Sequence, residues 1–151
     1  MIVRAPKNSK SKISRTNPEA ARTEKILIAS QDLRVAGLMK EYLSETGYDA
    51  ACELNLDAAL ETLLGTRVDL LIVDGEMPEK VLNDFVKAVH RIKPGLPMIA
   101  VGLSERETRG KTLSAFVSAF IEKPFSISDI SKTINEIKAQ SPIDSFGNAP
   151  L

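Results

Sequence analysis

The chain has 151 residues, a length that fits one domain of ordinary size with about thirty residues to spare. Hydrophobic residues make up 43% and charged residues 26%, which is typical of a globular protein and argues against general disorder. Twenty basic residues balance twenty acidic ones, and only seven residues are aromatic, so the composition as a whole does not favour nucleic-acid binding.

The beginning of the chain differs in composition from the rest. Residues 1–25 carry seven basic and two acidic side chains, whereas residues 26–140 carry thirteen basic and seventeen acidic ones. Prolines and polar residues interrupt any regular period in residues 1–24. We therefore expect a flexible basic tail there, a globular domain over residues 25–140 and a second flexible tail over residues 141–151. The basic tail is the part from which weak attraction to nucleic acid, anionic lipid or an acidic partner would arise.

Short apolar runs alternate with amphipathic stretches through the domain. The apolar runs are typical of strands in a buried parallel sheet, and they lie at residues 26–29, 48–53, 68–73, 98–101 and 119–121. Helical patterns follow them at residues 35–46, 57–65, 81–92, 105–115 and 126–137. Their period predicts that Leu38 and Val81 face the core and that Asp57 caps the second helix.

Five strands alternating with five helices in about 115 residues predict an α/β fold with helices on both faces of a parallel sheet. In such a sheet the functional side chains gather at the carboxyl ends of the strands. This rule selects Ser30, Gln31 and Asp32 after the first strand, Asp74 after the third, Gly102 and Ser104 after the fourth, and Lys123 after the fifth.

Asp74 stands where the most apolar strand stops. A carboxylate in that place can act as a nucleophile toward phosphorus or as a metal ligand. Lys123 precedes Pro124 at the end of the fifth strand, and we expect the sheet to bring its ammonium group close to Asp74. Such an ammonium group would keep Asp74 ionised and would neutralise a phosphoryl oxygen.

Three motifs at this spacing carry a family resemblance, namely KILI at 25–28, Asp74 with Met77-Pro78, and FIEKPF at 120–125. Together with the alternation, they make residues 25–139 resemble a CheY-like receiver domain of two-component response regulators. The resemblance implies a flavodoxin-like, doubly wound five-stranded sheet of order 2-1-3-4-5. It also implies phosphoryl transfer from a histidine kinase or phosphotransfer protein onto Asp74, with Mg²⁺ as cofactor.

The resemblance further implies that Lys123 is the phosphate counter-ion and that Gly102 and Phe120 occupy the family's two switch positions. The sequence departs from the family at Gly102, where a Thr or Ser hydroxyl is usual, and at Leu103, where a small residue is usual. The missing hydroxyl would otherwise link the phosphoryl group to Phe120. Ser104 could replace it only if the loop after the fourth strand bends back.

The acidic pair that the family places after the first strand is also missing, because Ser30 and Gln31 stand there. The remaining candidate metal ligands are Asp74, Gln31 and Glu76. Since Mg²⁺ prefers anionic oxygens, we expect this site to be weakened. Transfer of a phosphoryl group onto a carboxylate depends on neutralising crowded negative oxygens, so phosphorylation of Asp74 should be slow or absent.

These features predict an atypical stand-alone receiver in bacterial signal transduction, with Asp74 as candidate phosphoacceptor. Its output would be protein–protein contact with an unknown downstream protein, through the face from the fourth strand to the fifth helix. It would be no enzyme beyond its own phosphorylation by a kinase or small phosphodonor. The alternative is a pseudo-receiver, a protein-binding module that never takes phosphate. A flavodoxin-like cofactor binder is a third reading, disfavoured because no glycine lies in 30–33.

Several other classes of protein are excluded or disfavoured. One cysteine, Cys52, and one histidine, His90, leave no material for a disulfide framework or a zinc site. No apolar run approaches the ~20 residues that span a bilayer, and the amino terminus lacks the apolar stretch of a secretion signal. We therefore expect a cytoplasmic protein. The residues after 140 are too few for a DNA-binding module.

Overall fold

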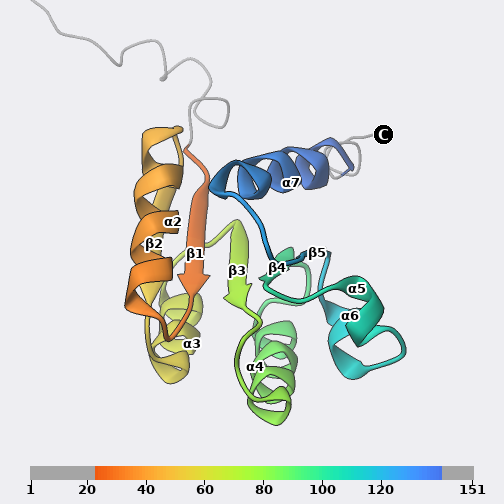
Figure 1. Cartoon of the computed structure of the whole chain (residues 1–151). Helices are drawn as coiled ribbons and strands as arrows, with labels where there is room; N and C mark the ends of the chain where they lie inside the picture. The colour runs from red at the N-terminus through yellow and green to blue at the C-terminus, as the bar shows by residue number, and fades with distance from the viewer. Residues whose placement is uncertain (1–22, 141–151) are drawn as a thin grey trace, which may run out of the picture.

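The structure, a computed structural model, describes residues 23–140 and contains one five-stranded parallel sheet in the order β2-β1-β3-β4-β5 (Figure 1). The strands are β1 (Lys25–Ala29), β2 (Asp49–Glu53), β3 (Leu70–Asp74), β4 (Met98–Val101) and β5 (Ala119–Ile121). This is the strand order that the family resemblance implied, so the expected flavodoxin-like fold is confirmed.

The helices within residues 23–140 are α2 (Leu33–Glu45), α3 (Leu56–Gly65), α4 (Glu79–Ile92), α5 (Glu105–Thr108), α6 (Thr112–Phe116) and α7 (Ile127–Gln140). The single helix predicted over residues 105–115 is in fact two short ones. Gly110, with a φ of 79°, and the extended backbone of Arg109 separate them. No helix in this part of the chain is long and apolar enough to cross a membrane.

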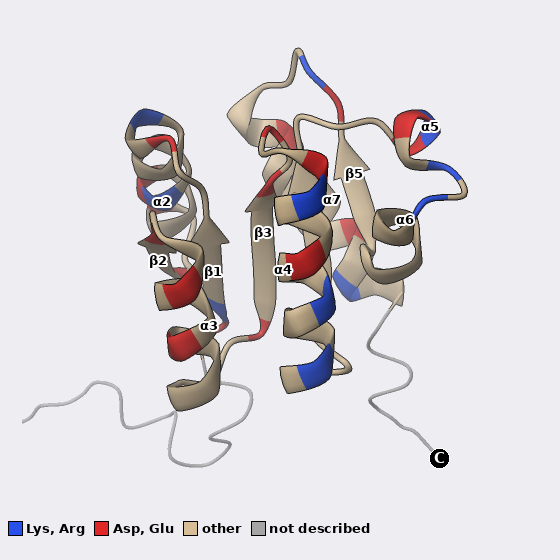
Figure 2. Ribbon diagram, turned by 90° about the horizontal axis from the view of Figure 1, so that it is seen from below, with Lys and Arg blue, Asp and Glu red and all other residues tan. Residues whose placement is uncertain are grey.

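Each face of the sheet has its own core. Successive strand residues point to opposite faces, so Leu27 and Leu71 pack with α3 and α4, whereas Ile28 and Ile72 pack with α2 and α7. Both faces are covered, which is why the strands consist of nearly continuous apolar runs. In Figure 2, charged residues lie on the helices and at strand ends, whereas the middles of β1 and β3 carry none.

Two predicted core positions are wrong. Leu38 of α2 is 59% exposed and Val81 of α4 is 38% exposed. The buried stripe of α2 runs through Ala36, Met39 and Leu43 instead, and that of α4 begins at Leu82. In both helices several apolar residues offer overlapping stripes, and the position of the sheet decides which stripe is buried.

The start of α3 also differs from the prediction. Its N-cap is Asn55, whose side-chain oxygen accepts a hydrogen bond from Ala58 N at 3.0 Å. Asp57, which was predicted to be the cap, lies in the first turn. A carboxylate there still interacts favourably with the positive end of the helix dipole. Asn and Asp are both good N-caps, and the sequence alone does not decide between two candidates so close together.

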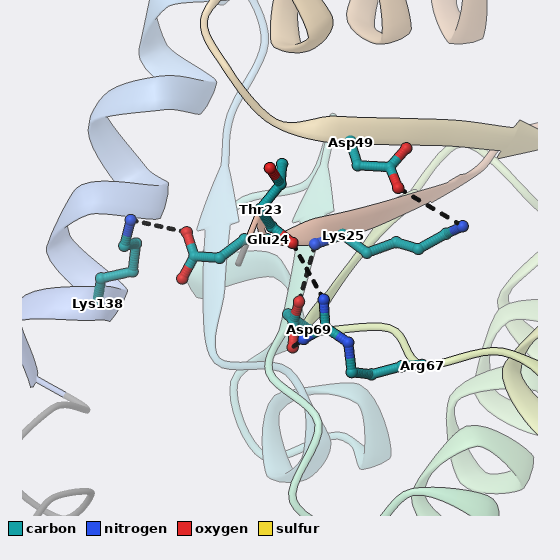
Figure 3. Close-up of polar contacts among 7 residues, drawn as sticks. All are labelled: Thr23, Glu24, Lys25, Asp49, Arg67, Asp69 and Lys138. Carbon is teal, nitrogen blue, oxygen red and sulfur yellow. Dashed lines mark hydrogen bonds and ion pairs between the residues drawn. The ribbon is translucent and has the colours of Figure 1, made fainter. Parts of the chain in front are cut away.

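Polar contacts tie the chain together at the amino ends of the strands (Figure 3). The Glu24 carboxylate pairs with Lys138 of α7 at 2.7 Å, and Lys25 N donates to Asp69 at 2.8 Å. The hydrogen bond from Lys138 to Glu24 raises the pKa of the lysine above its usual value. Glu24 thus belongs to the folded domain, one residue before the predicted boundary. The two predicted tails otherwise lie outside the described residues.

Candidate functional site

The carboxyl ends of the strands bring most of the predicted site residues to one edge of the sheet. Asp74 is the last residue of β3 and lies beside Val101 of β4. Ser30 and Gly102 directly follow β1 and β4, and Lys123 follows β5 by two residues. The strand register therefore places these four residues at the same edge, as the sequence predicted.

Asp74 is partly buried and is held by two hydrogen bonds. Its Oδ2 accepts from Ser30 Oγ at 3.0 Å, and its Oδ1 accepts from the backbone N–H of Glu76 at 2.9 Å. Ser30 is fully buried, and its hydroxyl oxygen also accepts from Asp32 N at 3.1 Å. The neighbours of this carboxylate on the β1 side are thus neutral groups in fixed positions.

Lys123 is not paired with Asp74 as the sequence analysis expected. Its Nζ forms an ion pair with the carboxylate of Glu76. Among residues 23–140, Asp74 has no lysine or arginine nitrogen within 4.0 Å. Glu76 prevails because it lies two residues beyond the end of β3 and has a longer side chain, which reaches the loop after β5.

Gly102 makes room for this ion pair. Its φ of +91° is a conformation that side chains rarely adopt, and a Cβ atom there would lie 3.3 Å from Cγ of Glu76. The Glu76 side chain thus lies directly beside the position where the family usually carries a hydroxyl. Phe120, at the second predicted switch position, is half-buried and packs against the core on the α3 and α4 side.

A close contact that the sequence analysis missed lies next to Asp74. A Cβ atom on Gly75 would fall 2.6 Å from Cγ of Leu103, so the leucine side chain rests directly on the glycine backbone. The signal was present in the sequence, because a bulky Leu103 in place of a small residue needs space that Gly75 provides. The apolar side chain consequently covers the backbone just after the candidate phosphoacceptor.

The remaining polar candidates at this edge have structural roles. Asp32 caps α2, accepting from Arg34 N at 3.0 Å. Ser104 accepts from Glu107 N at 3.0 Å in the capping box of α5, so its hydroxyl does not replace the one missing at Gly102. Gln31 is exposed.

The donors at this edge do not fit a resident Mg²⁺ ion. Mg²⁺ binds octahedrally through oxygen ligands, of which one or more are normally carboxylates that the ion helps to neutralise. Here Asp74 supplies one carboxylate, that of Glu76 is engaged by Lys123, and Ser30 and Gln31 are neutral. Within residues 23–140, no group of three histidine, cysteine, aspartate or glutamate side chains is arranged to hold a metal ion.

A doubly wound sheet with an aspartate at the end of β3 and a Lys-Pro pair after β5 defines a receiver-type signalling domain. Comparison with known families agrees, because residues 26–135 match the family described as response regulator receiver domain. The chain belongs to this family.

Curated relatives are similar at low identity. The transcriptional regulatory protein CrdR of Helicobacter pylori is 25% identical over 134 residues, which are 83% of this chain and 60% of CrdR. The transcriptional regulatory protein PdtaR of Mycobacterium tuberculosis is 28% identical over 116 residues, which are 76% of this chain and 57% of PdtaR. The chain thus spans less than two thirds of the length of these relatives.

Solved structures show the same fold. A CheY-like receiver domain protein from Methanospirillum hungatei matches with a TM-score of 0.70 and 23% identity, covering 79% of this chain and 96% of its own. The response regulator TrrA of Thermotoga maritima, in complex with Mg²⁺ and a beryllium fluoride, matches with a TM-score of 0.67 and 21% identity. That match covers 76% of this chain and 99% of TrrA.

Proposed function

We propose that this receiver domain acts as a phosphorylation-independent protein-binding module in signal transduction. The observation that supports this most directly is the donor set beside Asp74. Ser30 and Gln31 are neutral, and the hydroxyl of Ser30 is already bonded to Asp74. A phosphoryl group arriving at Asp74 would therefore find no second unpaired carboxylate to hold Mg²⁺ beside it, because Glu76 is already paired with Lys123.

The charges around Asp74 also disfavour its phosphorylation. Phosphoryl transfer depends on electrostatic stabilisation of the oxygens around phosphorus, which carry the negative charge in the transition state. Lys123 is the cation that the family resemblance implies for this purpose, and here it is paired with Glu76. A phosphoryl group on Asp74 would have to compete with the Glu76 carboxylate for Lys123 and would also be repelled by it.

The output surface that we propose is the face from β4 to α7. Its α5–α6 segment presents Arg106, Arg109 and Lys111, all exposed, although Lys111 lies 3.8 Å from Glu79 of α4. Basic side chains in such positions attract an acidic surface of a partner protein, and the attraction weakens with salt. Because residues 26–140 carry more acidic than basic side chains, a downstream protein is favoured over a nucleic acid as the partner.

The test is exposure of the purified protein to acetyl phosphate and Mg²⁺, followed by intact-mass spectrometry. We expect no species heavier by one phosphoryl group, because the charge around Asp74 is not neutralised. A phosphorylated species that disappears in Asp74→Asn would contradict the proposal. An authentic receiver with an intact acidic pair, treated in parallel, shows that the reagent is active.

The second candidate function is that of a phosphorylated receiver in which a histidine kinase or phosphotransfer protein modifies Asp74 and Lys123 neutralises the phosphoryl group. It is favoured by the place of Asp74 at the end of β3 and by the exposure of the Lys123–Glu76 pair, whose side chains are about half accessible. An exposed ion pair is weak, so Lys123 could exchange partners. The same mass measurement separates the two candidates.

A further inference from the structure

We infer that the Glu76 carboxylate is a built-in anion. It occupies the position beside Lys123 that a free oxyanion or a phosphoryl oxygen would otherwise take. This inference rests on the proposed function, because a receiver that works without phosphate has no need to keep that place open. It assigns to Glu76 a role different from the metal-ligand role expected from the sequence. Its consequence is that the native site should be closed to oxyanions.

The backbone and the side chain of Glu76 both contribute to its position beside Lys123. Its N–H donates to Asp74 Oδ1 at 2.9 Å, which fixes the loop immediately after β3. Its side chain then extends over Gly102 to Nζ of Lys123. Three loops, those after β3, β4 and β5, are thus connected through one carboxylate.

Gly102 and Glu76 depend on each other. A Cβ atom on Gly102 would lie 3.3 Å from Cγ of Glu76, a contact tight enough that the Glu76 side chain would have to move by a few tenths of an ångström. A threonine or serine in this position would crowd the Glu76 side chain and would also have to adopt a φ of +91°, which side chains rarely do. The absence of a side chain at position 102 therefore favours the present position of the Glu76 carboxylate.

The charges explain why the native site should exclude oxyanions. An oxyanion approaching Lys123 meets the carboxylate of Glu76, and Asp74, which accepts a hydrogen bond from the Glu76 backbone, adds a second negative charge nearby. Among residues 23–140, Lys123 contacts Glu76 but not Asp74. Removal of the charge of Glu76 would leave Lys123 without the carboxylate partner that it has in the native chain. That change should convert the edge of the sheet into a weak site for a tetrahedral oxyanion, for which inorganic phosphate is the simplest probe.

The test is a titration of inorganic phosphate into the full chain at constant ionic strength, followed by amide NMR at Gly102 and Lys123. We expect Glu76→Gln to show saturable shifts at these amides and to bind phosphate at least tenfold more tightly than the native chain. Adding Lys123→Ala to Glu76→Gln should abolish the shifts. Glu79→Gln removes a nearby carboxylate, paired with Lys111, and should behave like the native chain.

Either of two results would overturn the inference. One is phosphate binding of equal strength by the native chain and by Glu76→Gln, and the other is no saturable shift in a Glu76→Gln chain whose spectrum shows it folded. The titration contains no phosphodonor and no metal ion. It therefore fails or succeeds independently of whether Asp74 accepts a phosphoryl group, which is the test of the proposed function.

Discussion

Asp74 illustrates how much of a side chain's chemistry depends on its immediate neighbours. Its carboxylate lies at the end of β3, as a phosphoacceptor would, but it accepts a hydrogen bond from the hydroxyl of Ser30 rather than sharing a metal ion with a second carboxylate. The hydroxyl is neutral and fully buried, so it orients Asp74 without supplying charge. Orientation alone does not neutralise an incoming phosphoryl group.

The contact of Gly75 with Leu103 gives a prediction about the stability of the fold. Gly75→Ala should lower the free energy of unfolding by about 1–3 kcal/mol, because the new methyl group would overlap the leucine side chain and force a shift. In a chain that also carries Leu103→Ala, the cost of Gly75→Ala should become smaller but should not vanish, because a Cβ atom on Gly75 would still lie 2.9 Å from the backbone oxygen of Val101. Urea unfolding of the two single variants and the double variant measures this coupling.

Gly95→Ala is the matched control, since a Cβ atom on Gly95 meets nothing within 4 Å. It should cost clearly less than Gly75→Ala. If the changes at Gly75 and Leu103 were simply additive, the Leu103 side chain would not rest on Gly75 as described and would not cover the backbone after Asp74.

Single positions at the site were predictable from the sequence, but their pairing was not. Asp74, Gly102 and Lys123 were predicted to follow strand ends because apolar runs mark those ends; the structure places Gly102 and Lys123 there, and Asp74 is the last residue of β3. The pairing of Lys123 with Glu76 depends on two loop conformations and on the positive φ of Gly102, which a linear pattern does not encode. Their roles in phosphorylation stay predictions until they are tested.

At the scale of elements, the strands were predicted more accurately than the helices. A strand buried on both faces is a continuous apolar run, and its limits are visible in the sequence. A helix buries only one stripe, and α2 has more apolar residues than one stripe needs, which is why Leu38 was wrongly assigned to the core. The break between α5 and α6 occurs at Arg109 and Gly110, inside a stretch too polar to show a clear period.

The contact between α7 and the start of β1 gives a prediction about pH. The hydrogen bond to Glu24 raises the pKa of Lys138 above its ordinary value of 10.5. A raised pKa means that this contact stabilises the folded state below about pH 10.5 and that the stabilisation is lost as the pH rises through the raised pKa. Glu24→Gln should lower the pKa of Lys138 and reduce that alkaline loss of stability.

NMR titration of the side-chain carbon next to Nζ of Lys138 measures this pKa directly. Glu61→Gln, which removes an exposed carboxylate of α3, is the control and should leave the pKa of Lys138 unchanged. If the pKa of Lys138 were the same in the native chain and in Glu24→Gln, the ion pair would not persist in solution.

In the molecule as a whole, the two ends of the sheet have different roles. The carboxyl ends of the strands carry the candidate site with Asp74 and Lys123, and the amino ends carry the contacts of Glu24, Lys25 and Lys138 (Figure 3). The charge of the chain is also unevenly distributed. Its net charge is zero, but residues 1–25 carry five net positive charges and residues 26–140 carry four net negative ones. A partner would therefore meet segments of opposite charge.

The domain that we propose should not hold a phosphoryl group together with Mg²⁺ at Asp74. The most direct measurement is a titration of the native chain with beryllium fluoride and Mg²⁺, the ligands that TrrA holds, followed by amide NMR at Asp74, Gly102 and Lys123. We predict no saturable shift at these three amides. A saturable shift that is present in the native chain and lost in Asp74→Asn would contradict the account.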